Sequence, residues 1–86
     1  PYLSEVTLTG TGTAQTLLIT GQNTAFNSTS LVSAGAGVTV TSIQVVSPRH
    51  LVVNVTIQPG ATPGPRPVVV RTGTEEASKL VGFTLP

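Results

Sequence analysis

Short runs of alternating aliphatic and polar residues recur along the whole chain, separated by glycine and proline. The clearest run covers residues 51–57, in which every second residue is a large aliphatic one and Asn54 and Thr56 lie between them. A period of two places the aliphatic side chains on one face of an extended strand, so the pattern predicts a half-buried β-strand. No stretch of helical length repeats an apolar residue with the period of a helix, and we therefore expect no helix.

Seven strands of this kind are predicted. They cover residues 2–8, 16–20, 30–33, 38–46, 51–57, 66–72 and 79–85. Residues 10–13, 35–37 and 59–65 are predicted to be turns or loops, and residues 73–76 a solvated hairpin tip. Short strands at intervals of about 8–12 residues are typical of an antiparallel sandwich. The predicted fold is an all-β, immunoglobulin-like antiparallel β-sandwich of about seven short strands, without a disulfide because the chain has no cysteine.

The alternation also predicts which side chains enter the core. In the strand over residues 66–72, Val68 and Val70 are expected to point inward, and the last strand is expected to contribute Leu80, Phe83 and Leu85. Residues 38–46 have no purely polar face, which predicts a strand that bends or changes partner midway.

Composition narrows the possible functions. Only 8% of the residues are charged, the net charge is +1, and Cys, Met, Trp and Asp are absent. Four basic residues against three Glu are too few for a phosphate-binding surface, and no apolar run approaches the roughly 18 residues of a membrane-spanning helix. We therefore expect no nucleic-acid partner, no membrane insertion, no metal and no cofactor. The 86 residues (1–86) correspond to one domain, which we expect to be part of a larger protein.

Residues capable of acid–base chemistry are few. His50 is the only imidazole, and a catalytic triad would require a nucleophile such as Ser47 and one of the acids Glu5, Glu75 and Glu76 to converge on it. A polar pair beside a turn is the simpler interpretation of His50 and its neighbour Arg49. We therefore predict no catalytic residue and no enzymatic activity.

Two possible ligand sites have structural interpretations that we prefer. Glu75 and Glu76 could contact a cation, but calcium takes six to eight oxygen ligands. The Gly-Thr-Gly-Thr segment at residues 10–13 lacks the Gly-Lys-Ser/Thr ending of a phosphate-binding loop, which indicates a flexible turn.

Two covalent modifications are also conceivable from residue types. Lys79, Asn54 and Glu5 have the chemistry of an internal Lys–Asn amide bond, although the sequence does not place Lys79 on an apolar face. The triplets that begin at Asn27 and Asn54 match the glycosylation pattern, which arises by chance in a threonine-rich chain.

Residues 16–26, with the sequence TLLITGQNTAF, resemble the strand, Gly-x-Asn and Phe of IPT/TIG-type immunoglobulin-like domains. The Gly-Val-Thr-Val that begins at Gly37 and the Pro-Gly turn and Val-x-Val strand within residues 61–72 are similar to later parts of the same family. The structural signature is Gly21, Asn23, Phe26, Gly37, Pro63, Gly64, Val68 and Val70. Gly21 is expected to end a strand where a side chain would strain the backbone, and Phe26 to fill the end of the sandwich where the chain crosses between sheets.

The resemblance implies a non-catalytic module of a bacterial secreted or cell-surface protein. We predict a structural or interaction domain that spaces or displays neighbouring domains of the same chain and can meet other copies through edge strands. Two alternatives stay open. One is a carbohydrate-binding accessory domain of a polysaccharide-degrading enzyme, with Tyr2 as the only aromatic free to stack on a glycan. The other is a self-assembling surface module whose uncharged Thr/Val surface forms the interface.

Overall fold

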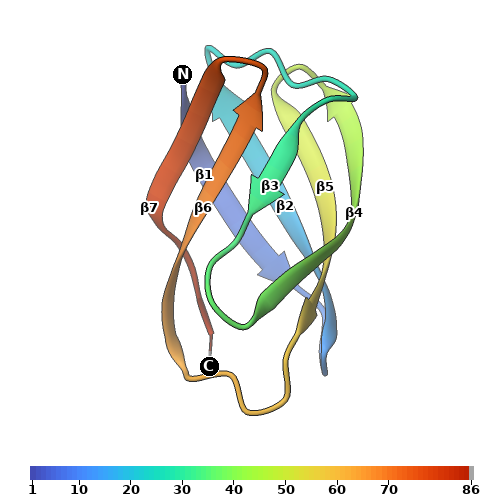
Figure 1. Ribbon diagram of the computed structural model, residues 1–86, viewed down its shortest axis with the longest axis vertical. Helices are drawn as coiled ribbons and strands as arrows, with labels where there is room; N and C mark the ends of the chain where they lie inside the picture. Colours follow the sequence, from blue (N-terminus) through green and yellow to red (C-terminus); the bar gives the residue numbers. More distant parts are fainter. Residues whose placement is uncertain (86) are drawn as a thin grey trace.

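The computed structural model describes residues 1–85 and shows two antiparallel β-sheets packed face to face (Figure 1). Its strands are β1 (Tyr2–Thr9), β2 (Ala14–Gln22), β3 (Leu31–Ser33), β4 (Val38–Ser47), β5 (His50–Ile57), β6 (Gly64–Thr72) and β7 (Glu75–Leu85). The four-stranded sheet has the order β1-β2-β5-β4, and the three-stranded sheet has the order β3-β6-β7. The predicted all-β antiparallel sandwich is thereby confirmed. Among the described residues there is no helix long and apolar enough to cross a membrane. The predicted domain ends at Pro86, which lies outside the described residues.

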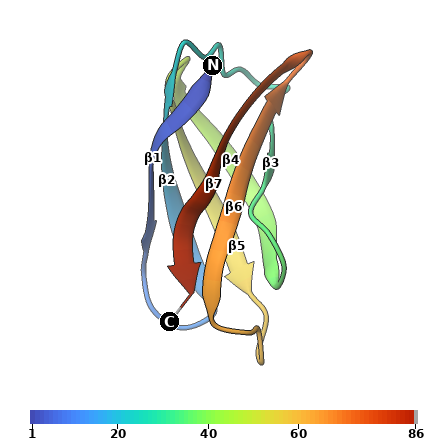
Figure 2. The same cartoon turned by 90° about the vertical axis from the view of Figure 1, so that its left-hand side faces the viewer.

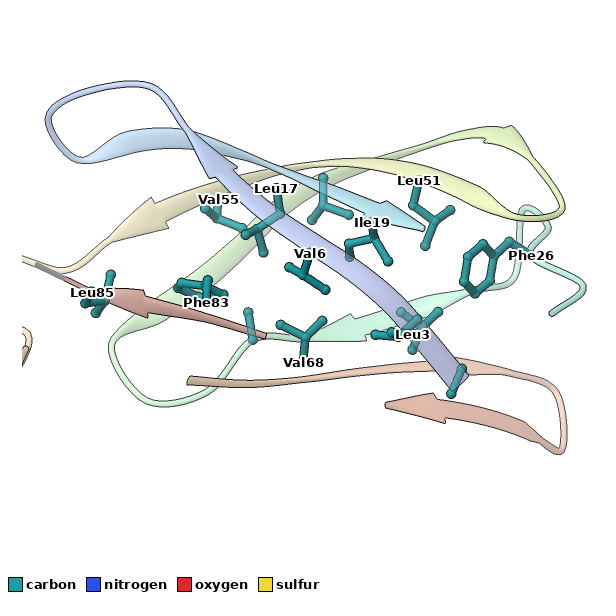
Figure 3. Close-up of a cluster of buried hydrophobic side chains, with 14 residues drawn as sticks. Leu3, Val6, Leu17, Ile19, Phe26, Leu51, Val55, Val68, Phe83 and Leu85 are labelled. Atoms are coloured by element: carbon teal, nitrogen blue, oxygen red, sulfur yellow. The ribbon is translucent and has the colours of Figure 1, made fainter. Parts of the chain in front are cut away.

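The core lies between the sheets and consists mainly of the strand side chains that point inward, usually every second residue (Figure 3). The fully buried large side chains are Leu17, Ile19, Leu51, Val53, Val55, Val68 and Val70. Each such side chain contributes about 1.5–3 kcal/mol through removal of its apolar surface from water. Phe26 is buried at one end of this core, in the loop of residues 23–30 that crosses from β2 to β3 (the crossing loop), as predicted.

A bulge explains why β4 has no purely polar face. The pairing of β4 with β5 shifts register between Val40 and Ser42, so Thr41 is an extra residue that reverses the alternation. The residues that pack against the core therefore come from both sides of the bulge: Val38, Val40, Ile43 and Val45. The predicted bend is confirmed, but β4 keeps β5 as its partner throughout.

A larger irregularity in β7 overturns one prediction about the core. Arg66 pairs with Phe83, whereas Val68 pairs with Lys79, so β7 has extra residues at this point. Proline cannot donate a hydrogen bond to a ladder, and Pro67 on β6 lies at the shift. The bulge leaves Leu80 pointing outward and 86% exposed, so its predicted burial is wrong, whereas Phe83 is buried as expected.

The chain enters and leaves the sandwich at opposite poles of its long axis. The N-terminus lies at one pole, and β7 runs to the other (Figures 1 and 2). The molecule measures 34 × 21 × 18 Å. Strands β1 and β7 lie side by side and close one flank of the sandwich, while β4 is the edge strand at the opposite flank.

Candidate functional site

At the pole where the chain begins (the N-terminal pole), the crossing loop is tied to two hairpins. The Phe26 amide donates to the Pro48 carbonyl at 3.0 Å, and the Thr24 hydroxyl donates to the same carbonyl at 2.8 Å. The Ala25 amide donates to Oε1 of Glu75, at the start of β7, at 3.1 Å. Because Pro48 belongs to the β4–β5 turn and Glu75 to the three-stranded sheet, these bonds fix the loop to both sheets.

A buried pair of hydroxyls adds a further tie at the same pole. Ser30 Oγ lies 2.7 Å from Thr72 Oγ1 at the end of β6, and it also accepts a hydrogen bond from the Asn27 amide at 3.0 Å. Both side chains are buried. Each hydroxyl is therefore satisfied within the protein, as buried polar groups generally are.

The two neighbouring glutamates do not form the predicted solvated tip. The turn consists of Gly73 and Thr74, and β7 begins at Glu75. Glu75 is half-buried and holds the crossing loop, whereas Glu76 pairs with Nε of Arg71 at 3.0 Å on the protein surface. The two carboxylates thus have separate partners and do not converge on one site.

At the opposite pole (the C-terminal pole), Arg66 joins two loops. Its guanidinium is buried and donates to the carbonyls of Ala36 (2.7 Å), Thr62, Gly64 (3.3 Å) and Pro65 (3.2 Å). These oxygens carry partial negative charge and replace the water that a buried cation loses. Within residues 1–85 no carboxylate forms an ion pair with Arg66, and all the hydrogen bonds of its guanidinium in this part of the chain go to backbone carbonyls. Arg66 thereby connects the β3–β4 loop to the loop before β6.

Gly21 occupies a crowded position of ordinary backbone geometry. It lies within β2, which continues to Gln22, so the prediction that Gly21 ends the strand is wrong. A Cβ atom at Gly21 would lie 2.5 Å from Thr24 Oγ1 and 2.8 Å from Phe26 Cζ, and space alone excludes a side chain. The left-handed backbone belongs to Asn23, with a φ of 55°.

The remaining signature residues are divided between the C-terminal pole and the core. The Gly37 carbonyl accepts from the Gln58 amide at 2.8 Å, and Gly64, with a φ of 138°, begins β6 directly after the exposed Pro63. Val68 and Val70 are buried, as predicted. The signature residues therefore support the fold at several places and do not gather around one binding site.

The structure brings Ser47 and His50 together. Ser47 Oγ lies 2.9 Å from His50 Nδ1 across the β4–β5 turn, and it accepts from the Arg49 amide at 3.2 Å. Glu5 pairs with Thr20, and Thr20 pairs with His50, so a whole strand separates the carboxylate from the imidazole. No hydrogen bond or ion pair joins Glu5 to His50 in the described part of the chain. His50 flanks the turn, as predicted, whereas its neighbour Arg49 lies within the turn.

Asn54 lies in the middle of β5 on the outer face of the four-stranded sheet. Its Oδ1 accepts from Thr16 Oγ1 at 3.1 Å, and its Nδ2 donates to Ser42 Oγ at 2.9 Å. These bonds form a polar row across three strands. Lys79 lies on β7 in the other sheet, so the structure does not place it against Asn54 for an amide bond.

The other candidates lie at the surface. Residues 10–13 form the exposed turn between β1 and β2, as predicted, and Asn27 is exposed in the crossing loop. Tyr2 is 54% exposed, whereas both phenylalanines are buried. No three His, Cys, Asp or Glu residues between positions 1 and 85 are grouped closely enough to hold a metal ion.

The sandwich thus has a pole at each end of its apolar core, and at each pole hydrogen bonds connect loops that are far apart in the sequence. Comparison of the chain with protein-family models, with curated proteins and with solved structures finds no match.

Proposed function

We propose that this chain is a non-catalytic, immunoglobulin-like module that spaces or displays neighbouring domains of a longer secreted or cell-surface bacterial protein. The observation that carries the proposal is the position of the N-terminus and of the end of β7 at opposite poles of a 34 Å axis. A domain connected in this way adds its long axis to the distance between its neighbours, because the chain cannot enter and leave on the same side.

The order of the strands supports the immunoglobulin-like part of the proposal. Constant-type immunoglobulin domains have strands A, B, E and D in one sheet and strands C, F and G in the other. Lettering the seven strands here in chain order gives the same two sheets. The crossing loop, with Gly21, Asn23 and Phe26, fits the IPT/TIG type, which would be a variant without the cysteine pair and the tryptophan of antibody domains.

The ties at the poles support the spacing role. A hydrogen bond contributes about 0.5–1.5 kcal/mol to stability, and more when its loss would leave a buried group unsatisfied. At the N-terminal pole such bonds join the crossing loop to both sheets, and at the C-terminal pole Arg66 joins two loops. The poles are where neighbouring domains would attach, so firm poles transmit orientation from one domain to the next.

A tandem fusion of two copies tests the spacing role. Small-angle X-ray scattering should give a maximum dimension that exceeds that of the single chain by about the 34 Å of one long axis. A fusion in which Arg66→Met loosens the C-terminal pole of the first copy serves as the control, and it should sample a broader range of dimensions. A tandem that folds back into a side-by-side pair would contradict the proposal.

The carbohydrate-binding alternative makes a different prediction, which rests on the exposed ring of Tyr2. Aromatic faces stack on sugar rings, so a glycan-binding domain would be retained on insoluble polysaccharide and would lose that retention in Tyr2→Ala. The spacing role predicts no retention of either protein. A pull-down on insoluble polysaccharides with both variants distinguishes the two functions.

A further inference from the structure

The four-stranded sheet ends in a strand whose outer edge is unpaired. β4 has ten residues and forms its ladder with β5 alone. From residues 1–85, the only other backbone hydrogen bond that involves β4 joins the Val38 amide to the Gly35 carbonyl at 3.4 Å, within the preceding turn. Alternate N–H and C=O groups of an edge strand point away from its ladder, so they can pair with a further strand.

The other edges of the sandwich are protected. β1 lies against β7, and its inward residues Leu3 and Val6 are consequently buried. β7 carries Glu75, Glu76 and Lys79 as well as a bulge, and β3 has only three residues. Charge on β7 and shortness of β3 prevent edge-to-edge pairing and distinguish these edges from β4, which contains bulges of its own.

β4 has neither charge nor proline. The sequence contains no charged residue between Glu5 and Arg49, so the whole strand lies in a neutral segment. Bulges at Thr41 and Val46 interrupt its ladder and leave two regular segments, residues 38–40 and residues 42–45, of which the second is the longer. A neutral, β-prone edge strand is the kind that pairs with another strand.

An apolar seam follows this unpaired edge. The inward side chains of β4 are only half-buried, and they are Val38, Val40, Ile43 and Val45. The inward residues of the neighbouring β5, by contrast, are fully covered: Leu51, Val53 and Val55. A strand added to β4 would cover the seam with every second side chain, and removal of this apolar surface from water favours the addition.

We infer that β4 is the strand-addition site for a second copy of this chain, which pairs antiparallel with β4 to give a two-fold dimer with one continuous sheet. The inference deepens the proposed role as a structural and interaction module and rests on it. A two-fold contact places the same surface of each copy against itself. A charged edge would therefore bring like charges together, and the neutrality of β4 removes that repulsion.

The alternation of β4 restricts the register of such a dimer. Residues directly opposite each other in an antiparallel pair point to the same side of the sheet. Inward residues must therefore oppose inward residues. Within the longer regular segment, residues 42–45, this places the two-fold axis at Ile43 or Gln44. In either register Gln44 lies opposite or diagonally beside Gln44 of the other copy. Aliphatic side chains then meet on the inner face, and hydroxyl and amide side chains meet on the outer face.

Sedimentation of the purified chain with a pair of matched variants tests the inference. The weight-average mass should rise with concentration from the monomer value of 8.7 kDa toward twice that value. Gln44→Lys should weaken dimerisation about tenfold or more, because it places two ammonium groups side by side. Thr7→Lys introduces the same charge in the same cross-strand row of the outer face, but on β1, and should leave the association nearly unchanged. Both positions are exposed, so at concentrations where the wild type is monomeric both variants should unfold at the wild-type temperature.

Disulfide trapping gives a second measurement, since the chain has no natural cysteine. Under mild oxidation Gln44→Cys should form a covalent dimer, and Thr7→Cys should not. A chain that stays monomeric up to about 1 mM, equal effects of the two lysine variants, or equal trapping of the two cysteine variants would overturn the inference. The tandem fusion carrying Gln44→Lys in both copies separates this question from the spacing role, because its length does not depend on pairing through β4.

Discussion

Ser30 Oγ and Thr72 Oγ1 lie 2.7 Å apart in a buried pair that joins the crossing loop to the end of β6. Thr72→Val keeps the shape of the side chain but leaves the Ser30 hydroxyl without this partner. We expect the free energy of unfolding to fall by about 1–2 kcal/mol, because a buried hydroxyl loses its hydrogen bond. Urea denaturation measures the change. Thr7→Val on the exposed surface of β1 is the control and should change the value by less than about 0.5 kcal/mol; equal changes would refute the importance of the pair.

Arg66 should be the most sensitive of the charged positions. Arg66→Met removes the group that satisfies four backbone carbonyls, and we expect a loss of about 2 kcal/mol or more. Arg66→Lys should recover little of this, since an ammonium lacks the planar, forked donors of a guanidinium.

The control for Arg66 is Arg71→Met, which removes an exposed ion pair with Glu76 and should cost less than about 1 kcal/mol. Thermal and urea unfolding of the three variants provide the measurement. Wild-type stability of Arg66→Lys would show that charge alone, without the hydrogen-bond geometry, is sufficient at this pole.

Gly82 and Val68 should be energetically coupled. A Cβ at Gly82 would lie 2.5 Å from Val68 Cγ2 and 3.1 Å from Val68 Cβ, so Gly82→Ala should destabilise the protein by about 1–3 kcal/mol through overpacking. Val68→Ala opens space at the same point and carries its own cost. The double variant should be more stable than the sum of the single changes implies, by at least about 0.5 kcal/mol. Additive changes in a double-mutant cycle would show that the two sites are independent.

The intact mass of the protein should equal the mass of its sequence. Lys79 and Asn54 lie in different sheets, and the Asn54 amide is engaged by Thr16 and Ser42. An internal Lys–Asn amide bond should therefore not form. Mass spectrometry of the denatured protein provides the measurement, and a deficit of about 17 Da, the ammonia lost in such a bond, would contradict this expectation.

The period-two pattern predicted the seven strands to within a few residues, and it placed Val68 and Val70 inward correctly, but it could not predict where the alternation shifts within β4 and β7. The mixed faces of residues 38–46 indicated an irregularity in β4, but nothing marked Thr41 as the extra residue, because threonine is common in regular strands. Pro67 was a signal for irregularity, yet the extra residues lie on the paired strand, and their effect on Leu80 depends on tertiary pairing. A bulge depends on how two strands pair, so the sequence of one strand alone does not predict where the bulge lies.

The ties at the two poles were beyond sequence reasoning for a related reason. The bond from the Ala25 amide to Glu75 and the bond from Arg66 to the Ala36 carbonyl join residues far apart in the chain, and each uses a backbone group that every sequence contains. The available signal was Arg66 itself, a charged residue between two prolines in a chain with very few charges. A charged side chain that points toward the core from a strand needs hydrogen-bond partners, and backbone carbonyls are one possible set of partners.

The contact between β1 and β7 has a mechanical consequence. The two terminal strands belong to different sheets, yet they lie side by side and run in the same direction along the long axis (Figure 2). A pull on the two ends of the chain therefore slides one terminal strand past the other in shear. The interactions along both strands then bear the load simultaneously, whereas a strand peeled from its end would lose them one after another.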